Sequence, residues 1–373
     1  MSTRRISLLL ALLFLAGCIG VPIHGRTKKK PIPESTDALP YEWVEIPAAK
    51  DVVLRGIYAP NEGPPVLLLY GAGMGIAGIW EAVTMLHDGG YAVLCCDYRG
   101  TGYSSGRWWT SRYLDDDARV LYEWLLVNKG ERVGVLGVSI GAIAGAGLAD
   151  HPTPPAALVL DRPVDPRTIV GRYIGKDLGA FARFVSALLV HAKCDVKLRE
   201  RFAAATAPTL LVLPQFDVLC PPEDVARFTE GAAATVERAV VPGGHVSSHL
   251  VDPVRWRTTV LDFLDARLRP GEPPKGGRSI PPDPMRVVEA RMEACTLHVR
   301  LEGEVPARLR LLVMGRKANA FIEVPQPGRE LSFPLERKQV KRLGEVFAVR
   351  AVPQSFRRAI TARWIVGEQP PKG

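Results

Sequence analysis

The sequence predicts an α/β fold with a mostly parallel sheet and helices on both faces, followed by a small C-terminal antiparallel β domain. Between residues 41 and 266, strand-like apolar runs alternate with helical segments, and the later runs are apolar on both faces. A stretch rich in proline and glycine at 267–284 then interrupts this pattern. Beyond it, apolar residues recur at every second position, which is typical of antiparallel strands.

The first 18 residues have the features of an export signal. Arg4 and Arg5 are followed by an apolar run at 6–17, which is shorter than the roughly 20 residues that a membrane-spanning helix needs. The end of this run, Leu15-Ala16-Gly17-Cys18, resembles the lipobox of bacterial lipoproteins. That resemblance implies cleavage before Cys18, lipid on Cys18 and a lipid-anchored protein of the cell envelope, on the periplasmic or outer face. The alternatives are an ordinary secretory signal or an uncleaved anchor.

Residues 19–40 are rich in proline and lysine and have no periodicity, so we expect a flexible tether. The lysines at 28–30 either contact phospholipid headgroups or belong to a solvated linker. The net charge of +9 invites a nucleic-acid partner, but the basic residues are spread along the whole chain. Neither a basic helix nor an aromatic RNA-binding motif accompanies them, so no nucleic-acid binding is expected.

Residues 41–268 form the predicted α/β domain. Its expected strands are 52–59, 65–71, 91–98, 133–139, 156–161, 209–214 and 236–242. Its expected helices are 76–89, 111–129, 141–150, 222–231 and 250–268. Cys95 and Cys96 lie inside one of these strand patterns, where cysteine usually behaves as a small buried hydrophobe.

The C-terminal part is expected to begin after a linker at 269–284. Residues 285–366 predict a small β-sheet or sandwich with no helix between its strands. The expected strands are 295–303, 307–315, 319–325, 330–336, 345–353 and 358–366. Nothing in this part indicates chemistry, and the role of the domain stays open.

The stretch Gly137-Val138-Ser139-Ile140-Gly141 joins a predicted strand to a predicted helix. This G-x-S-x-G pattern fits a turn in which glycines permit a strained backbone that lifts the serine above the sheet. Ser139 is therefore a candidate nucleophile. The alternative is a tight strand-to-helix turn whose serine has no chemical role.

A serine nucleophile needs a histidine base, and the histidine needs a carboxylate that fixes its tautomer. Asp217 follows the strand at 209–214, and His245 follows the next strand. Asp161 also ends a strand and is the alternative acid. His249 is the alternative base, although it lies where the last helix is expected to begin.

Four blocks of sequence together resemble the α/β-hydrolase fold family, over residues 41–266. They are PVLLLYGAGMG at 65–75, DYRGTGYSSG at 97–106, GVSIG at 137–141, and the surroundings of Asp217 and His245. The nearest members are the short-lid lipases, esterases and serine-aminopeptidase-like enzymes. The family usually has His-Gly where this chain has Tyr70-Gly71.

The resemblance implies a serine hydrolase that cleaves an ester, thioester or amide through an acyl-enzyme intermediate. Ser139, His245 and Asp217 would be the catalytic triad, because Asp217 occupies the commoner acid position. The backbone N–H groups of Ala72 and Ile140 would form the oxyanion hole. We expect a carboxylesterase- or lipase-like enzyme that acts on a small-molecule or lipid acyl substrate. The alternatives are a serine aminopeptidase-like enzyme and a non-catalytic envelope protein that binds partners.

A short lid is expected at 162–207. Its apolar stretch at 178–192 would either contact an acyl chain or pack on the sheet. Trp108 and Trp109 would line the rim of the site, anchor at lipid, or be buried. The H-V-S-S-H sequence at 245–249 lacks the glutamate of a zinc-protease helix, so no metal is expected. No cofactor is expected either.

Overall fold

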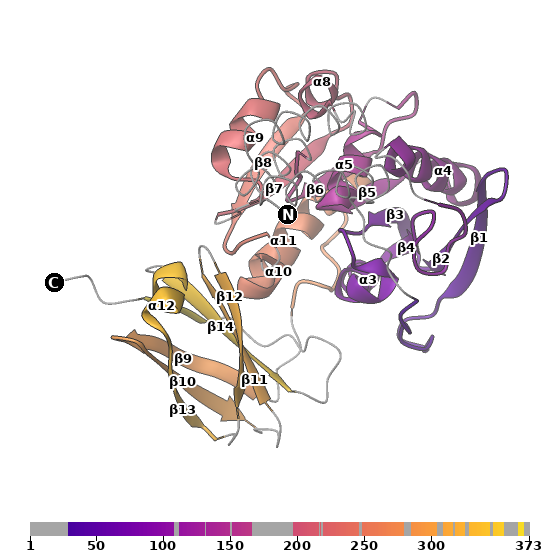
Figure 1. Cartoon of the computed structure of the whole chain (residues 1–373). Helices are drawn as coiled ribbons and strands as arrows, with labels where there is room; N and C mark the ends of the chain where they lie inside the picture. The colour runs from indigo at the N-terminus through magenta and orange to yellow at the C-terminus, as the bar shows by residue number, and fades with distance from the viewer. Residues whose placement is uncertain are drawn as a thin grey trace, which may run out of the picture. The chain divides into compact units, whose positions relative to one another are not determined.

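The computed structural model describes most of the chain after residue 28 (Figure 1). The described residues are 29–107, 112–130, 132–149, 151–165, 197–215, 217, 219–245, 248–279, 285–303, 309–315, 318–324, 328–343, 346–353 and 365–368. They form two compact units. The first contains the described residues up to Leu213, Leu219–Ala239 and Thr259–Gly277. The second contains Pro214–Val218, Val240–Thr258 and the residues from Arg278 onward.

An eight-stranded sheet has the strand order β1-β2-β4-β3-β5-β6-β7-β8. The strands are β1 (Glu42–Ala49), β2 (Val52–Ala59), β3 (Gly63–Leu69), β4 (Tyr91–Cys96), β5 (Gly134–Val138), β6 (Ala157–Asp161), β7 (Thr209–Pro214) and β8 (Val236–Val241). β1 pairs antiparallel with β2, and β2 pairs antiparallel with β4. The β4–β3, β3–β5, β5–β6 and β6–β7 pairs are parallel. The predicted mostly parallel sheet is therefore confirmed, with β1 as an additional edge strand.

Helices cover both faces of this sheet, as predicted. Gly134 and Val135 are neighbours on β5, so they face opposite sides. A Cβ on Gly134 would meet the side chains of Leu264 and Leu268, whereas the side chain of Val135 lies near Gly145. α11 and α5 therefore lie on opposite faces. The helices are α2 (Gly75–Gly78), α3 (Trp80–Asp88), α4 (Arg112–Lys129), α5 (Ile140–Ala146), α8 (Leu198–Ala203), α9 (Pro222–Phe228), α10 (Ser248–Val251) and α11 (Pro253–Leu268).

The centre of the sheet explains why the sequence runs are continuously apolar. Every residue of β4, β5 and β6 is buried, because helices exclude water from both faces. Cys95 and Cys96 lie in β4 and are buried, unpaired thiols, as expected for small hydrophobes. Burial raises the pKa of both thiols well above its ordinary value.

The second unit contains two antiparallel sheets, which confirms the predicted C-terminal β domain. One has the order β13-β10-β9 and the other β12-β11-β14-β15. The strands are β9 (Met285–Glu293), β10 (Thr296–Gly303), β11 (Leu309–Gly315), β12 (Ala318–Val324), β13 (Glu330–Pro334), β14 (Val346–Pro353) and β15 (Ile365–Glu368). Residues of both sheets, such as Leu297 and Leu311, share one apolar core.

Two details of this β domain differ from the prediction. β9 is an additional strand that lies before the first expected strand, 295–303. α12 (Arg337–Leu343) lies between β13 and β14, where no helix was expected. β13 ends at Pro334, which cannot donate to a strand ladder. Val340 on the helix then packs against the core, so a tertiary contact stabilises a segment that has little strand character of its own.

The described end of the predicted tether makes specific contacts. The Tyr103 hydroxyl donates to the carbonyl of Lys30 at 3.0 Å, and the Tyr41 hydroxyl donates to the carbonyl of Pro33 at 2.6 Å. Thr36 and Leu39 form a β-bridge. Within the described part of the chain, no helix combines the length and apolarity needed to cross a bilayer.

Several predicted features lie outside the described residues. They are the export signal with Cys18, the tryptophans 108 and 109, and the central part of the predicted lid with its apolar stretch. Of that lid, only 162–165 and 197–207 are described, and the second of these ranges contains α8.

Candidate active site

Ser139 sits in a strained turn between β5 and α5. Its φ is 56° and its ψ is −114°, a backbone conformation that non-glycine residues adopt rarely and at an energetic cost. The Ser139 N–H donates to the carbonyl of Asp161 at 2.9 Å, and its own carbonyl accepts from the N–H of Ala142 at 3.0 Å. The side chain is partly exposed. This geometry matches an elbow that presents a serine at the carboxyl end of a strand.

The two glycines of the elbow are required by contact between backbones. A Cβ on Gly137 would lie 2.4 Å from the carbonyl oxygen of Gly141. A Cβ on Gly141 would lie 2.1 Å from the carbonyl oxygen of Leu69. Neither backbone oxygen can swing aside as a flexible side chain can. The glycines therefore allow the start of α5 to approach the end of β3.

This approach brings the loop after β3 against the candidate nucleophile. A Cβ on Gly71 would lie 3.3 Å from the Cβ of Ser139. Ala72 is exposed at this point, and Ile140 is buried in the first turn of α5. The two predicted oxyanion donors thus belong to the two segments that meet at Ser139.

Asp217 and His245, both in the second unit, form a buried hydrogen-bonded pair. His245 Nδ1 lies 2.8 Å from Asp217 Oδ2, and the two residues are 9% and 3% exposed. A carboxylate only accepts hydrogen bonds, so Nδ1 carries a proton, and in the neutral imidazole Nε2 is the nitrogen with the lone pair. The Gln215 N–H donates to the carbonyl of Val241 at 2.9 Å, which ties the chain after β7 to the end of β8.

The two alternative residues have other surroundings. The Asp161 carboxylate is fully buried and forms an ion pair with Arg162 at 3.0 Å. His249 lies in α10, where its ring stands edge-on to Trp256 with 5.8 Å between ring centroids. Asp161 is thus paired with a cation, and His249 contributes to packing.

A buried polar cluster around Asp97 was not predicted. The Tyr70 hydroxyl donates to Asp97 Oδ1 at 2.9 Å, and the Tyr103 N–H donates to Oδ2 at 2.8 Å. Burial raises the pKa of Asp97, although the hydrogen bonds from Tyr103 and Tyr70 act in the opposite direction. The departure of Tyr70 from the family's histidine was the available signal, but the sequence did not reveal its partner.

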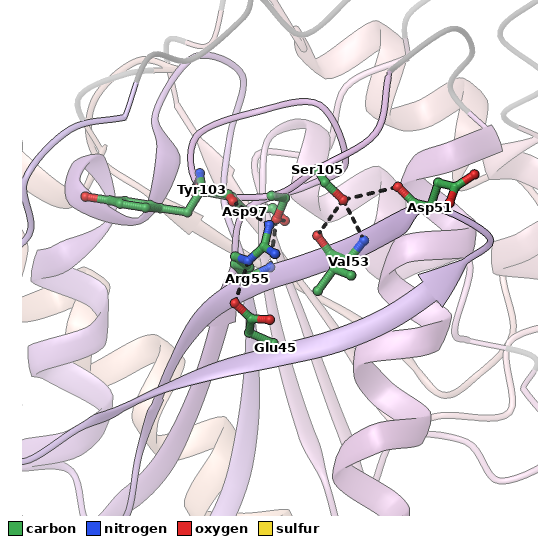
Figure 2. Close-up of polar contacts among 8 residues, drawn as sticks. Glu45, Asp51, Val53, Arg55, Asp97, Tyr103 and Ser105 are labelled. Atoms are coloured by element: carbon green, nitrogen blue, oxygen red, sulfur yellow. Dashed lines mark hydrogen bonds and ion pairs between the residues drawn. The ribbon is translucent and has the colours of Figure 1, made fainter.

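The loop that follows Asp97 is fixed to β2 by two serine hydroxyls. Val53 N–H donates to Ser105 Oγ and Arg55 N–H donates to Ser104 Oγ, both at 2.8 Å. Figure 2 shows Ser105 between Val53 and Asp51, and Arg55 beside Glu45 and Asp97. Hydroxyls thus accept from N–H groups of β2 that lie before its pairing with β4, which begins at Gly56.

A second serine–histidine contact lies on the three-stranded sheet. His298 Nδ1 is 2.9 Å from Ser332 Oγ, and His298 Nε2 is 3.6 Å from a Glu293 oxygen. The side chains of His298 and Glu293 are 28% and 55% exposed. Ser332 lies on a regular strand, so this contact lacks the strained turn found at Ser139. Among the described residues, no group of three or more histidine, cysteine or acidic side chains is arranged to hold a metal.

Comparison with known proteins defines the class to which this fold and site belong. Residues 64–230 match the alpha/beta hydrolase fold family. The chain belongs to this family, and the predicted resemblance is confirmed.

Three individual proteins of known sequence or structure are similar to this chain. The uncharacterized protein Rv2307c of Mycobacterium tuberculosis is 32% identical over 250 residues, which cover 63% of this chain and 83% of that protein. RutD of Variovorax paradoxus, named for a carbamate hydrolase activity, is 26% identical over 261 residues, covering 58% of this chain and 97% of RutD. The esterase Pf2001 of Pyrococcus furiosus shares the fold, with a TM-score of 0.54 and 24% identity over 65% of this chain and 97% of the esterase. The likeness to the Pyrococcus esterase shows the shared fold.

Proposed function

We propose that the protein is a serine hydrolase of the carboxylesterase or lipase type, with Ser139 as nucleophile, His245 as general base and Asp217 as its acid. The observation that carries the proposal is the strained elbow at Ser139, taken together with the buried His245–Asp217 hydrogen bond. Carboxyl ends of neighbouring parallel strands lie along one edge of a sheet. Ser139 follows β5, and the other two residues follow β7 and β8.

The proposed reaction proceeds in two halves. Ser139 Oγ attacks the substrate carbonyl carbon while His245 Nε2 takes the hydroxyl proton, and the resulting oxyanion accepts hydrogen bonds from the N–H groups of Ala72 and Ile140. His245 then protonates the leaving group, which departs and leaves an acyl-serine. Water attacks this ester, His245 accepts its proton, and the proton returns to Ser139 Oγ as the acid is released.

The hydrogen bond to His245 supports the assignment of Asp217 as the acidic member of the triad. Its carboxylate faces His245, whereas Asp161 forms a buried ion pair with Arg162. An aspartate beside the imidazole fixes its tautomer and stabilises the cation that forms when the base takes a proton. RutD and the Pyrococcus esterase carry names that indicate carbamate and ester hydrolysis. These names support hydrolysis of a carbonyl compound, with an ester as our first choice and an aminoacyl amide as the second.

We further propose that the enzyme acts at the cell envelope, held at a bacterial membrane by a lipid on Cys18. The support is the apolar run at 6–17 and the lipobox-like end of that run. The substrate would then be a small-molecule or membrane acyl ester that reaches the anchored domain.

A fluorophosphonate probe tests the catalytic proposal, because it modifies only an activated serine. The full chain should be labelled, and the adduct should map to Ser139 by mass spectrometry. Ser139→Ala should abolish labelling and lower ester turnover on the order of a millionfold. Ser332→Ala is the matched control, since Ser332 also contacts a histidine, and it should leave both signals intact. Absence of an adduct on the folded parent, or an adduct on Ser332, contradicts the proposal.

A further inference from the structure

We propose that Tyr70 is a positioning residue that holds the oxyanion loop, residues 71–75, in its active shape by clamping the loop's two ends to Asp97. This inference rests on the proposed serine-hydrolase function, because the loop carries Ala72, one of the two proposed oxyanion donors. Tyr70 stands immediately before the loop. Ile76 follows the loop, and its N–H donates to Asp97.

The carboxylate of Asp97 binds both ends of the loop. Its Oδ1 accepts from the Tyr70 hydroxyl at 2.9 Å and from the Ile76 N–H at 3.4 Å. Its Oδ2 accepts from the Tyr103 N–H at 2.8 Å. A Cβ on Gly102 would lie 1.9 Å from Oδ2, so only glycine at this position leaves room for the carboxylate. Asp97 is 1% exposed, so little water is available to replace a lost donor.

The backbone of Tyr70 is fixed as well as its side chain. The Tyr98 hydroxyl donates to the Tyr70 carbonyl at 3.0 Å, and the Tyr98 N–H donates to the Tyr70 hydroxyl oxygen at 3.1 Å. Thr101 Oγ lies 3.1 Å from the same hydroxyl. The two tyrosine rings pack with their centroids 4.6 Å apart. Tyr70 is therefore held at its hydroxyl and at its backbone carbonyl by one neighbouring segment.

The loop contains two glycines in left-handed backbone conformations. Between its ends, the Met74 N–H donates to the Gly71 carbonyl at 3.3 Å. Gly73 and Gly75 have φ values of 72° and 65°, and Ala72 is exposed. A segment with glycine at two left-handed positions has a wide choice of conformations. Because Gly71 lies against Ser139, a shift of the clamped ends moves the proposed donor relative to the nucleophile.

Tyr70→Phe removes the clamping hydroxyl and retains the ring. We expect ester kcat to fall by about 10- to 100-fold, since loss of an oxyanion donor elsewhere costs that much or more, while KM stays within about twofold because ground-state binding is unchanged. Affinity for an alkyl boronic acid, which mimics the tetrahedral intermediate, should fall by the same factor as kcat/KM. Tyr122→Phe is the matched control. Tyr122 lies on α4, and its hydroxyl donates to the Thr153 carbonyl at 3.1 Å. The substitution removes this other tyrosine hydroxyl.

Hydrogen–deuterium exchange separates this inference from the proposed function. Amides of residues 72–76 should exchange faster in Tyr70→Phe than in the parent or in Tyr122→Phe, whether or not the parent hydrolyses esters. Tyr98→Phe, which removes the donor to the Tyr70 carbonyl, should shift the same amides and serves if Tyr70→Phe does not fold. Unchanged exchange in the loop, or kcat values equal in the Tyr70 and Tyr122 variants, overturns the inference. A parent that no fluorophosphonate labels contradicts only the proposed function, and the exchange comparison still decides the clamp.

Discussion

Replacing Gly141 by alanine gives a sharp test of the elbow. The added Cβ would lie 2.1 Å from the Leu69 carbonyl oxygen and 2.8 Å from that of Tyr70. Close carbon–oxygen contacts in proteins begin near about 3.3 Å, so the first turn of α5 must move by about 1.2 Å. A displacement of about 1 Å at a catalytic centre can cost about 100-fold in rate. We therefore expect Gly141→Ala to lower ester turnover by about that factor, and overpacking to lower the free energy of unfolding by about 1–3 kcal/mol.

Gly145→Ala is the matched control, one turn further along α5. Its Cβ would lie 2.9 Å from Leu160 Cδ2, the end of a side chain that can move. Both substitutions raise helix propensity by about 1 kcal/mol, so propensity cancels in the comparison. The assays are kcat/KM on a short-chain ester, the rate of fluorophosphonate labelling, and urea unfolding. Equal turnover in the two variants would refute the argument that contact between backbones sets the position of Ser139.

Three further results are expected. Asp217→Asn should lower turnover by about 10⁴-fold with the fold intact, whereas Asp161→Asn should chiefly lower stability, by about 3 kcal/mol, because it removes the carboxylate from a buried ion pair with Arg162; the reverse pattern in kinetics and urea unfolding would exchange their roles. Tyr70→Phe should raise the already raised pKa of Asp97, because the lost hydrogen bond lowers it. A carboxyl group with a raised pKa in the folded state destabilises the fold as pH rises and the group must ionise. The variant should therefore be little less stable than the parent below about pH 4 and clearly less stable at neutral pH, and a pH-independent difference in unfolding free energy would contradict this. Cys18→Ala should block lipid attachment and cleavage before residue 18, measured by mass spectrometry of the membrane fraction, and unchanged processing would contradict the proposed anchor.

The sheet was predictable because each parallel strand carries its own signal. Runs such as 66–69 and 157–160 are apolar on both faces, and only strands buried on both faces need this. β1 was missed because it is an edge strand with several exposed residues, and its pairing with β2 is not visible in local periodicity. The helix α12 was missed for a related reason, since a core contact through Val340 decides its conformation.

The candidate site shows the same division between local and long-range information. The pairing of Asp217 with His245 could be expected, because two residues that follow successive strands come together at one sheet edge. The pairing of Tyr70 with Asp97 could not, because it depends on β4 lying beside β3 and on the side-chain length of one unusual tyrosine. The strained φ of Ser139 was predictable in kind from its flanking glycines, but the close approach of Gly141 to β3 was not.

The reaction rate of the two thiols in β4 can report how often the sheet opens around this strand. Cys95 and Cys96 lie on the strand between β2 and β3, in the interior of the sheet. A thiol reacts with a disulfide reagent only as an accessible thiolate, and burial denies both conditions to these two. Their modification rate therefore measures how often the sheet separates at its centre. Adducts on Cys95 and Cys96, separated by mass spectrometry from those on the partly exposed Cys295, would follow that event in the native protein.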